Sequence, residues 1–298
     1  PPAVGDYGLA LLAGDVVAIA DALGFARFHL VGHDWGAAIA WEVAGTVTNA
    51  RFAAALAATG DMNGDGFDDF AVSTVGWSND ASAYAGDVRV YLGGAGAWHQ
   101  QTPLRLVSPM GPGNYYGFAL AGVGDVNADG YPDLAIGAPG PGPGMGESRV
   151  YVHYGGSTGP RASADVVLMA PEVPGQFGVA VAGVGDIDQD GFADVAVASP
   201  GAGGFGRVYV HKGSVTGLRT TASYTLDAPG RTGPFARALG SRGDIDGDGI
   251  PDLLTGDPAW NMNSGRAFVF RGTSRGPEAM SWRTLEGTSS GARFGESL

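Results

Sequence analysis

The chain has 298 residues, a formal net charge of −13 and no cysteine. The acidic charge argues against binding to nucleic acid or to anionic membrane surfaces. The lack of cysteine excludes disulfides and thiolate metal sites, and no apolar run reaches the ~18 residues needed to span a bilayer. Glycine is abundant, at 53 residues, but apolar residues still make up 44% of the chain. We therefore expect a folded protein with many tight turns between short strands.

The first 47 residues differ in pattern from the rest of the chain. Helical apolar spacing over residues 12–24 is followed by a short apolar strand at 28–32 and by a second helical stretch at 37–44. The sequence HDWG joins the strand to the second helix, which is the layout of a nucleophile elbow. This segment resembles α/β hydrolases of the epoxide hydrolase and haloalkane dehalogenase type. The resemblance makes Asp34 the candidate nucleophile, with Trp35 beside the reacting group.

A nucleophile also needs a general base with its acid partner and an anion hole. In the hydrolases that the segment resembles, those groups come from strands before and well after the elbow. After Ala44 the sequence changes directly to another pattern, and the other histidines show no relay spacing. We therefore expect residues 1–47 to be an α/β-hydrolase-like fragment without catalysis, joined to a second unit.

From residue 49 onward the chain is built of repeats. Four acidic segments match one another: DMNGDGFDD from Asp61, DVNADGYPD from Asp125, DIDQDGFAD from Asp186 and DIDGDGIPD from Asp244. Their starts are 64, 61 and 58 residues apart, and each segment runs directly into an apolar stretch. A short strand precedes each acidic segment, and a glycine followed by an alternating strand comes about twenty residues later.

One unit is therefore strand, acidic loop, strand, turn and alternating strand, with a fourth edge strand such as Thr102–Val107 or Ser223–Leu226. Four short strands per ~60 residues predict β-propeller blades. The expected fold is mainly β, with a short α/β segment ahead of it. The expected blades span residues 49–108, 109–170, 171–229 and 230–290, and 291–298 opens a fifth.

Each acidic loop places oxygen-bearing side chains at positions 1, 3, 5 and 9, with glycine at position 6, and the carbonyl at position 7 can add a further oxygen. The expected ligands are Asp61, Asn63, Asp65, Phe67 and Asp69 in the first loop, Asp125, Asn127, Asp129, Tyr131 and Asp133 in the second, Asp186, Asp188, Asp190, Phe192 and Asp194 in the third, and Asp244, Asp246, Asp248, Ile250 and Asp252 in the fourth.

Oxygen ligands in a flexible loop favour Ca²⁺ over transition metals and Mg²⁺. Carboxylates so close together would repel one another without a cation, so we expect up to four calcium ions, one per repeat. The alternative, acidic turns without metal, is hard to reconcile with four copies at a regular spacing. An EF-hand is excluded because position 12 is Val72, Ile136, Val197 or Thr255, each in an expected strand, where that loop needs a glutamate and a following helix.

These units resemble the FG-GAP repeats of the integrin α-subunit propeller and its bacterial relatives. The Phe-Gly mark is assigned to Phe118, Phe177–Gly178 and Phe294–Gly295, and the Gly-Ala-Pro mark to Gly137–Pro139. The first and fourth units read RFAA and PFAR at the first mark, and Ala198–Pro200 and Gly256–Pro258 replace the second. The resemblance implies a seven-bladed, extracellular, calcium-stabilised propeller used in adhesion or ligand binding. Because four blades of a seven-bladed wedge do not close, an open arc is expected.

The leading functional hypothesis is a non-catalytic, secreted or surface-exposed propeller that recognises an unidentified protein or glycan. Two alternatives stay open. One is an accessory propeller of a hydrolase whose catalytic parts lie elsewhere in a longer chain. The other is an α/β hydrolase that uses Asp34 as its nucleophile.

Overall fold

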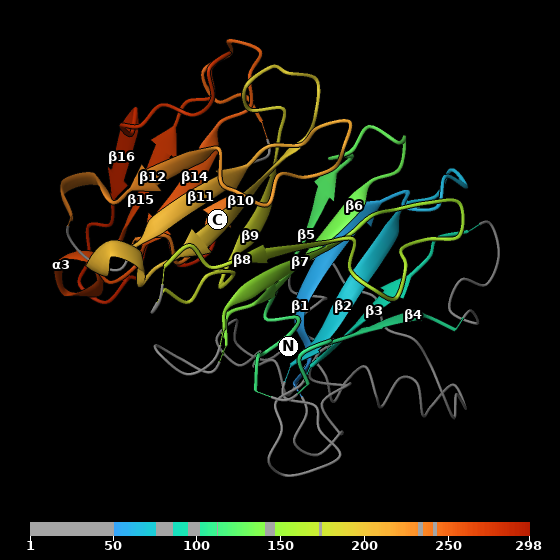
Figure 1. The fold of residues 1–298 in the computed structure, drawn as a ribbon. Coiled ribbons are helices and arrows are strands. Elements are labelled where there is room, and N and C mark those ends of the chain that lie inside the picture. The colour runs from blue at the N-terminus through green and yellow to red at the C-terminus, as the bar shows by residue number, and fades with distance from the viewer. Residues whose placement is uncertain are drawn as a thin grey trace, which may run out of the picture.

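Four antiparallel sheets of four strands each make up the described part of the computed structural model (Figure 1). It describes residues 51–75, 86–94, 102–111, 113–140, 147–172, 175–231, 235–240 and 243–298. The hydrolase-like segment with Asp34 lies outside these residues. The mainly β architecture confirms the fold class expected from the repeat.

Within each sheet the strands follow chain order, from innermost to outermost. The first sheet contains β1 (Arg51–Gly60), β2 (Asp69–Val75), β3 (Asp87–Tyr91) and β4 (Leu104–Val107). The second contains β5 (Ala119–Gly124), β6 (Asp133–Ala138), β7 (Arg149–His153) and β8 (Val166–Met169). The third contains β9 (Val181–Gly185), β10 (Asp194–Ser199), β11 (Arg207–His211) and β12 (Tyr224–Asp227). The fourth contains β13 (Leu239–Gly240), β14 (Leu253–Asp257), β15 (Arg266–Phe270) and β16 (Arg283–Glu286).

Helical structure in the described residues is limited to three short turns, namely η2 (Ala202–Gly204), η3 (Pro229–Arg231) and α3 (Trp260–Asn263). None of these turns follows an acidic loop. Each loop runs instead into the second strand of its sheet, β2, β6, β10 or β14. This agrees with the exclusion of an EF-hand.

The hydrophobic core lies between successive sheets. Three buried clusters join the first sheet to the second, the second to the third, and the third to the fourth. Because the two middle sheets are covered on both faces, every residue of β6 and of β10 is buried. This explains why these strands read as continuous apolar runs and not as alternating ones.

The sheets are arranged in an open arc. The innermost strands pack in chain order, β1 on β5, β5 on β9, and β9 on β13. Figure 1 shows the first sheet at one end of the described molecule and the fourth at the other. The arc expected from the blade number is therefore what the described residues form.

The Phe-Gly mark of the second repeat was assigned to the wrong residue. Phe118 is exposed, whereas Tyr116 is fully buried and occupies the place that Phe177 and Phe235 take in the next two repeats. Tyr116 and Gly117 thus form the aromatic–glycine pair of this repeat. The sequence YYGFA offers an aromatic residue on each side of the glycine, and only the packing distinguishes them.

Candidate cation sites

The four acidic loops share one hydrogen-bonded framework. The carboxylate at position 1 accepts the backbone N–H of position 5 through one oxygen, at 2.9–3.1 Å, and the N–H of the position-6 glycine through the other, at 2.6–2.8 Å. That glycine has φ between +89° and +94° in all four loops. The left-handed conformation explains the glycine and lets both oxygens of the position-1 carboxylate reach the backbone of positions 5 and 6.

The aspartate at position 9 fastens the loop to the third strand of its own sheet. One oxygen of Asp133 accepts the N–H of Val126, at position 2 of the loop, at 2.9 Å. The other oxygen accepts the N–H of Gly155, just beyond β7, also at 2.9 Å. The same pair of bonds holds Asp69, Asp194 and Asp252. Each loop is therefore tied to the backbone just beyond the third strand of its own sheet.

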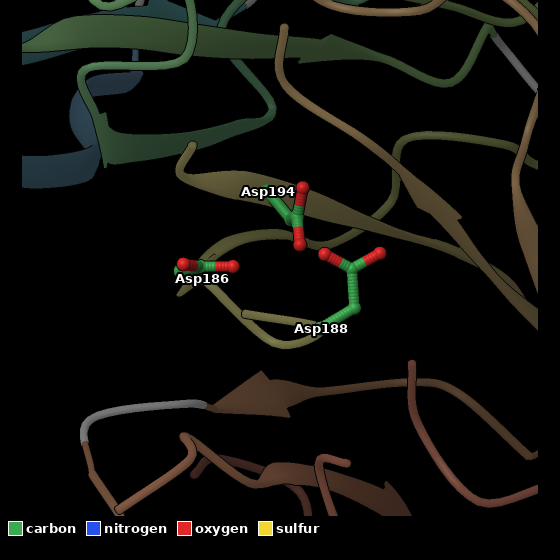
Figure 2. Close-up of side chains that lie close together, drawn as sticks. All are labelled: Asp186, Asp188 and Asp194. Atoms are coloured by element: carbon green, nitrogen blue, oxygen red, sulfur yellow. The ribbon is translucent and has the colours of Figure 1, made fainter. Parts of the chain in front are cut away.

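In the third loop the carboxylates of Asp186, Asp188 and Asp194 bring one oxygen each within 4.8 Å of one another. Figure 2 shows Asp188 and Asp194 turned toward one another, with Asp186 alongside. The side chain of Asp188 is 3% exposed, and its Oδ1 is buried without a hydrogen-bond partner. A buried carboxylate oxygen without a partner is energetically costly unless a cation or donor meets it.

In the fourth loop the carboxylates of Asp244, Asp246 and Asp248 likewise bring one oxygen each within 4.8 Å of one another. This cluster is more exposed than the one in the third loop. The backbone N–H groups of Gly249, Gly247 and Asp248 lower the pKa of Asp244 below its usual value, the bond from Gly249 having the largest effect. The carboxylate at position 1 is thus kept ionised.

The first and second loops have asparagine at position 3. Asn63 Nδ2 donates to Asp65 Oδ2 at 3.0 Å, and Asn127 Nδ2 donates to Asp129 Oδ2 at 2.9 Å. The amide therefore satisfies one oxygen of position 5 without adding charge. The structure gives these two loops the same framework as the others, while the main-chain carbonyls at position 7 stay predicted ligands.

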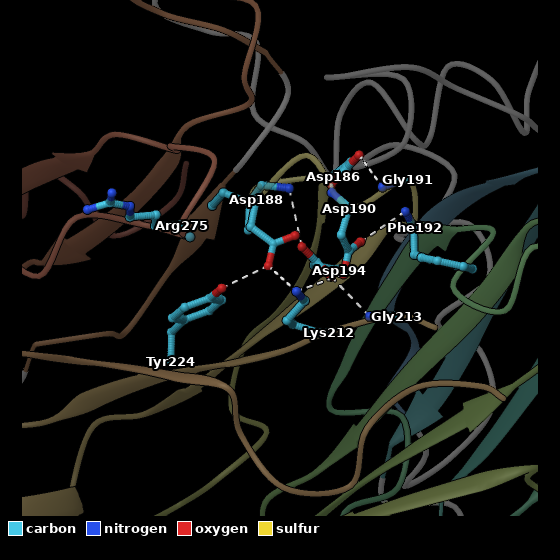
Figure 3. Close-up of polar contacts among 12 residues, drawn as sticks. Asp186, Asp188, Asp190, Gly191, Phe192, Asp194, Lys212, Gly213, Tyr224 and Arg275 are labelled. Atoms are coloured by element: carbon cyan, nitrogen blue, oxygen red, sulfur yellow. Dashed lines mark hydrogen bonds and ion pairs between the residues drawn. The ribbon is translucent and has the colours of Figure 1, made fainter. Parts of the chain in front are cut away.

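Sequence reasoning missed two basic residues at these sites. Lys212, which directly follows β11, forms ion pairs with Asp188 and Asp190, the latter at 2.7 Å (Figure 3). Arg271, which directly follows β15, pairs with Asp246. In both cases the base is more than twenty residues from its carboxylate partner in the sequence. The one available signal was that Lys212 is the only lysine in the chain.

Tyr224 of β12 adds a second contact to the third loop. Its hydroxyl donates to Asp188 Oδ2 at 2.8 Å, so this oxygen meets both Tyr224 and Lys212 while Oδ1 stays unpartnered. Burial, followed by the bond to Asp188, raises the pKa of Tyr224 to about 12. The phenol therefore remains a donor throughout the physiological range.

Burial also acts on the position-9 aspartates. It raises the pKa of Asp133 and of Asp194 to about 7, against the opposing effect of their backbone hydrogen bonds. Neighbouring carboxylates of the same loop raise these values further. The donor set of each loop consists of oxygen alone, which suits a hard cation such as Ca²⁺. The residues therefore fit the ion that the sequence predicts.

Comparisons with known proteins agree with both parts of the sequence analysis. Residues 116–153 and 177–211 match the FG-GAP repeat family, and residues 1–91 match the α/β hydrolase fold family. The second match extends beyond residue 47 into residues that form β1, β2 and β3. Across the described residues, no helix has the length and apolar character to cross a membrane.

Curated relatives include several integrin α subunits. Human integrin alpha-IIb is 40% identical over 154 residues, which make up 48% of this chain and 15% of the relative. Integrin alpha-V of Gallus gallus is 35% identical over 217 residues, 67% of this chain and 19% of the relative. Human integrin alpha-7 is 36% identical over 143 residues, 48% of this chain and 12% of the relative. The chain thus spans less than a fifth of each of these relatives. It carries FG-GAP repeats similar to those of integrin α subunits, and its N-terminal part matches the α/β hydrolase fold.

Proposed function

We propose that residues 49–298 are a calcium-binding propeller module that recognises a protein or glycan outside the cell, and that this module is not an enzyme. The observation that carries the proposal is the third loop. Asp188 there has a buried oxygen without a partner and belongs to one cluster of carboxylates with Asp186 and Asp194. The same backbone framework recurs in the other three loops, which supports one ion per repeat.

Calcium binding would stabilise the folded module by mass action. Sites of extracellular modules bind calcium at roughly 10⁻⁴–10⁻³ M, so a tenfold excess adds about 1.4 kcal/mol per site. Thermal melting with calcium and with a chelator should therefore differ by several degrees, and calorimetric titration should fit up to four ions. Magnesium serves as the control, because the flexible loops do not favour its octahedral geometry. Identical melting curves in calcium and in chelator would contradict the proposal.

Recognition is supported by the resemblance to integrin α repeats. The direct test is binding of the purified chain to arrays of glycans and extracellular proteins, in calcium and in chelator. A specific ligand whose binding requires calcium would support the proposal. Binding of equal strength in calcium and in chelator would show that recognition does not depend on the cation sites.

The match of residues 1–91 to α/β hydrolases favours a second candidate, an accessory propeller attached to a hydrolase. Under the main proposal Asp34 has no partner groups, so Asp34→Asn should leave hydrolysis of epoxides and haloalkanes at the background rate of the native chain. Turnover by the native chain that disappears in the variant would instead establish a hydrolase with Asp34 as its nucleophile.

A further inference from the structure

The four loops fall into two classes when position 3 is compared with the residue that follows the third strand. Loops one and two combine Asn63 with Leu92, and Asn127 with Tyr154. Loops three and four combine Asp188 with Lys212, and Asp246 with Arg271. A carboxylate thus appears at position 3 only where a base stands opposite it. Tyr154 turns elsewhere, since its hydroxyl accepts the N–H of Leu218 in the next repeat at 2.9 Å.

This pairing equalises the charge of the loops. The four side-chain ligand positions of the first and second loops hold three aspartates each, and those of the third and fourth hold four. Once Lys212 and Arg271 are counted, every loop has the same formal charge of −3, with all of its ligand aspartates ionised.

The bases contact one oxygen, Oδ2, of the position-3 carboxylate. Lys212 and Tyr224 both meet Asp188 Oδ2, whereas Oδ1 is buried without a hydrogen-bond partner. Lys212 also reaches Asp190 Oδ2, the oxygen that an asparagine amide satisfies in the first two loops. In the fourth loop, Arg271 pairs with Asp246 and lies 5.2 Å from the Trp282 ring centre. Contacts of this kind can orient the oxygen groups that would hold an ion.

We infer that Lys212 and Arg271 are built-in counter-ions that let the third and fourth loops keep their structure when calcium is withdrawn, while the first and second loops depend on the ion. This inference rests on the proposed calcium binding. The Lys212 side chain is 17% exposed and Asp188 only 3%, so water screens this pair less than a surface ion pair. The first and second loops hold three carboxylates each at the expected ligand positions, and no base follows their third strand. Loss of calcium should therefore open the amino-terminal half of the arc first.

Hydrogen–deuterium exchange of the whole chain tests the inference, measured by mass spectrometry in calcium and in chelator below the melting temperature. Removing calcium should speed exchange in residues 61–69 and 125–133 at least about fivefold more than in 186–194 and 244–252. If all four loops respond equally, the inference is wrong and calcium binding stands. If no loop responds, the calcium proposal itself is wrong.

Two variants show whether the base is the cause. Lys212→Leu copies Leu92 and should make the third loop as dependent on calcium as the first, whereas Lys212→Arg should keep it independent. The reverse exchange, Asn63→Asp with Leu92→Lys, should protect the first loop in chelator. If Lys212→Leu speeds exchange equally with and without calcium, Lys212 is an ordinary structural contact. A first loop left unprotected by the reverse exchange would likewise overturn the inference.

Discussion

In the first, third and fourth sheets, the glycine just before the third strand lies against the aromatic residue that begins the following Phe-Gly mark or its equivalent. A Cβ atom at Gly86, Gly206 or Gly265 would come within 2.0–2.3 Å of the carbonyl oxygen of Tyr116, Phe235 or Phe294. These glycines also have φ between +73° and +95°. The regular spacing of the glycine in the sequence therefore reflects a contact between repeats as well as a turn within one.

Gly206→Ala should consequently destabilise the protein by about 3 kcal/mol or more, through both the backbone conformation and the clash with Phe235. Gly204 provides a matched control, because it has φ +80° but open space where a Cβ would lie. Gly204→Ala should cost only the conformational part, about 1–2 kcal/mol. Urea unfolding in calcium measures both, and equal effects would show that the contact between repeats is unimportant.

A buried histidine in the third repeat lacks a partner that its counterpart has. In the second repeat, the Tyr116 hydroxyl lies 3.0 Å from His153 Nε2, and His153 Nδ1 lies 2.9 Å from the carbonyl oxygen of Arg161. In the third, His211 Nδ1 makes the same carbonyl contact, but its Nε2 is buried without a partner beside the Phe177 ring.

Phe177→Tyr should therefore stabilise the protein by about 1 kcal/mol, because the new hydroxyl can donate to His211 Nε2. Phe235→Tyr is the control, since the Phe235 ring packs against Phe268 and Phe270, which offer no side-chain acceptor. That substitution should destabilise the protein by about 1–3 kcal/mol. Thermal melting in calcium distinguishes the two, and a loss of stability in Phe177→Tyr would contradict the assigned geometry.

Burial lowers the pKa of His153 and of His211 below the usual value of 6.5. The unfolded chain therefore takes up protons that the folded chain does not, and stability should fall as the pH drops below about 6.5, by up to about 1.4 kcal/mol per unit for each histidine. His211→Phe introduces the residue that the fourth repeat has at this position, Phe270. It should reduce the slope of the free energy of unfolding against pH by the contribution of one histidine. Saturating calcium is needed, because Asp133 and Asp194, with a pKa of about 7, act in the opposite direction when no cation is bound. An unchanged slope in the variant would refute the assignment.

Among the elements, the acidic loops were the part that the sequence predicted best. Their four copies and their glycines predict one conformation for all four loops, and the shared hydrogen-bonded framework agrees with it, while the ligand sets stay predictions. Edge strands were also predicted closely, with β4 at Leu104–Val107 and β12 at Tyr224–Asp227. The base opposite Asp188 was not predicted, because 24 residues separate it from Lys212 and only the folded sheet brings them together. The Phe-Gly mark was assigned to Phe118 in place of Tyr116 for a similar reason. The motif fits either residue, and only burial in the folded protein distinguishes them.

Within the third loop, the roles of adjacent residues can be separated by substitution. Asp188→Ala removes the unpartnered oxygen and should reduce the free energy of unfolding that calcium adds by roughly one site's share, about 1.4 kcal/mol at a tenfold excess of calcium. Gln189→Ala should leave the effect of calcium unchanged. Gln189 is exposed, and the hydrogen bonds that hold the loop join Asp186, Asp190 and Phe192 without it. Equal responses in the two variants would remove Asp188 from the site.

At the scale of the whole molecule, the fourth sheet presents an apolar face that no other described element covers. This open face consists of Ile245, Leu285 and Phe294, which are 48%, 50% and 42% exposed. Their counterparts in the preceding repeats are nearly or fully buried. Ile245 corresponds to Met62, Val126 and Ile187, Leu285 to Leu106, Leu168 and Leu226, and Phe294 to Tyr116, Phe177 and Phe235. The difference arises because each earlier sheet has a successor packed on this face.

The open face should make the chain self-associate. Successive sheets within the chain already pack this kind of face against the next innermost strand three times, so the first sheet of a second copy offers a surface of the same kind. An exposed apolar patch and an incompletely paired edge both favour such association. Light scattering over a range of concentrations should show dimers or larger species in calcium.

Leu285→Glu should shift these species toward monomer, because a carboxylate would be buried in the contact. Val215→Glu is the control, since Val215 is 77% exposed in a turn of the third repeat and does not belong to the open face. A chain that stays monomeric at every concentration, or association that Leu285→Glu leaves unchanged, would show that the open face does not drive contact between copies.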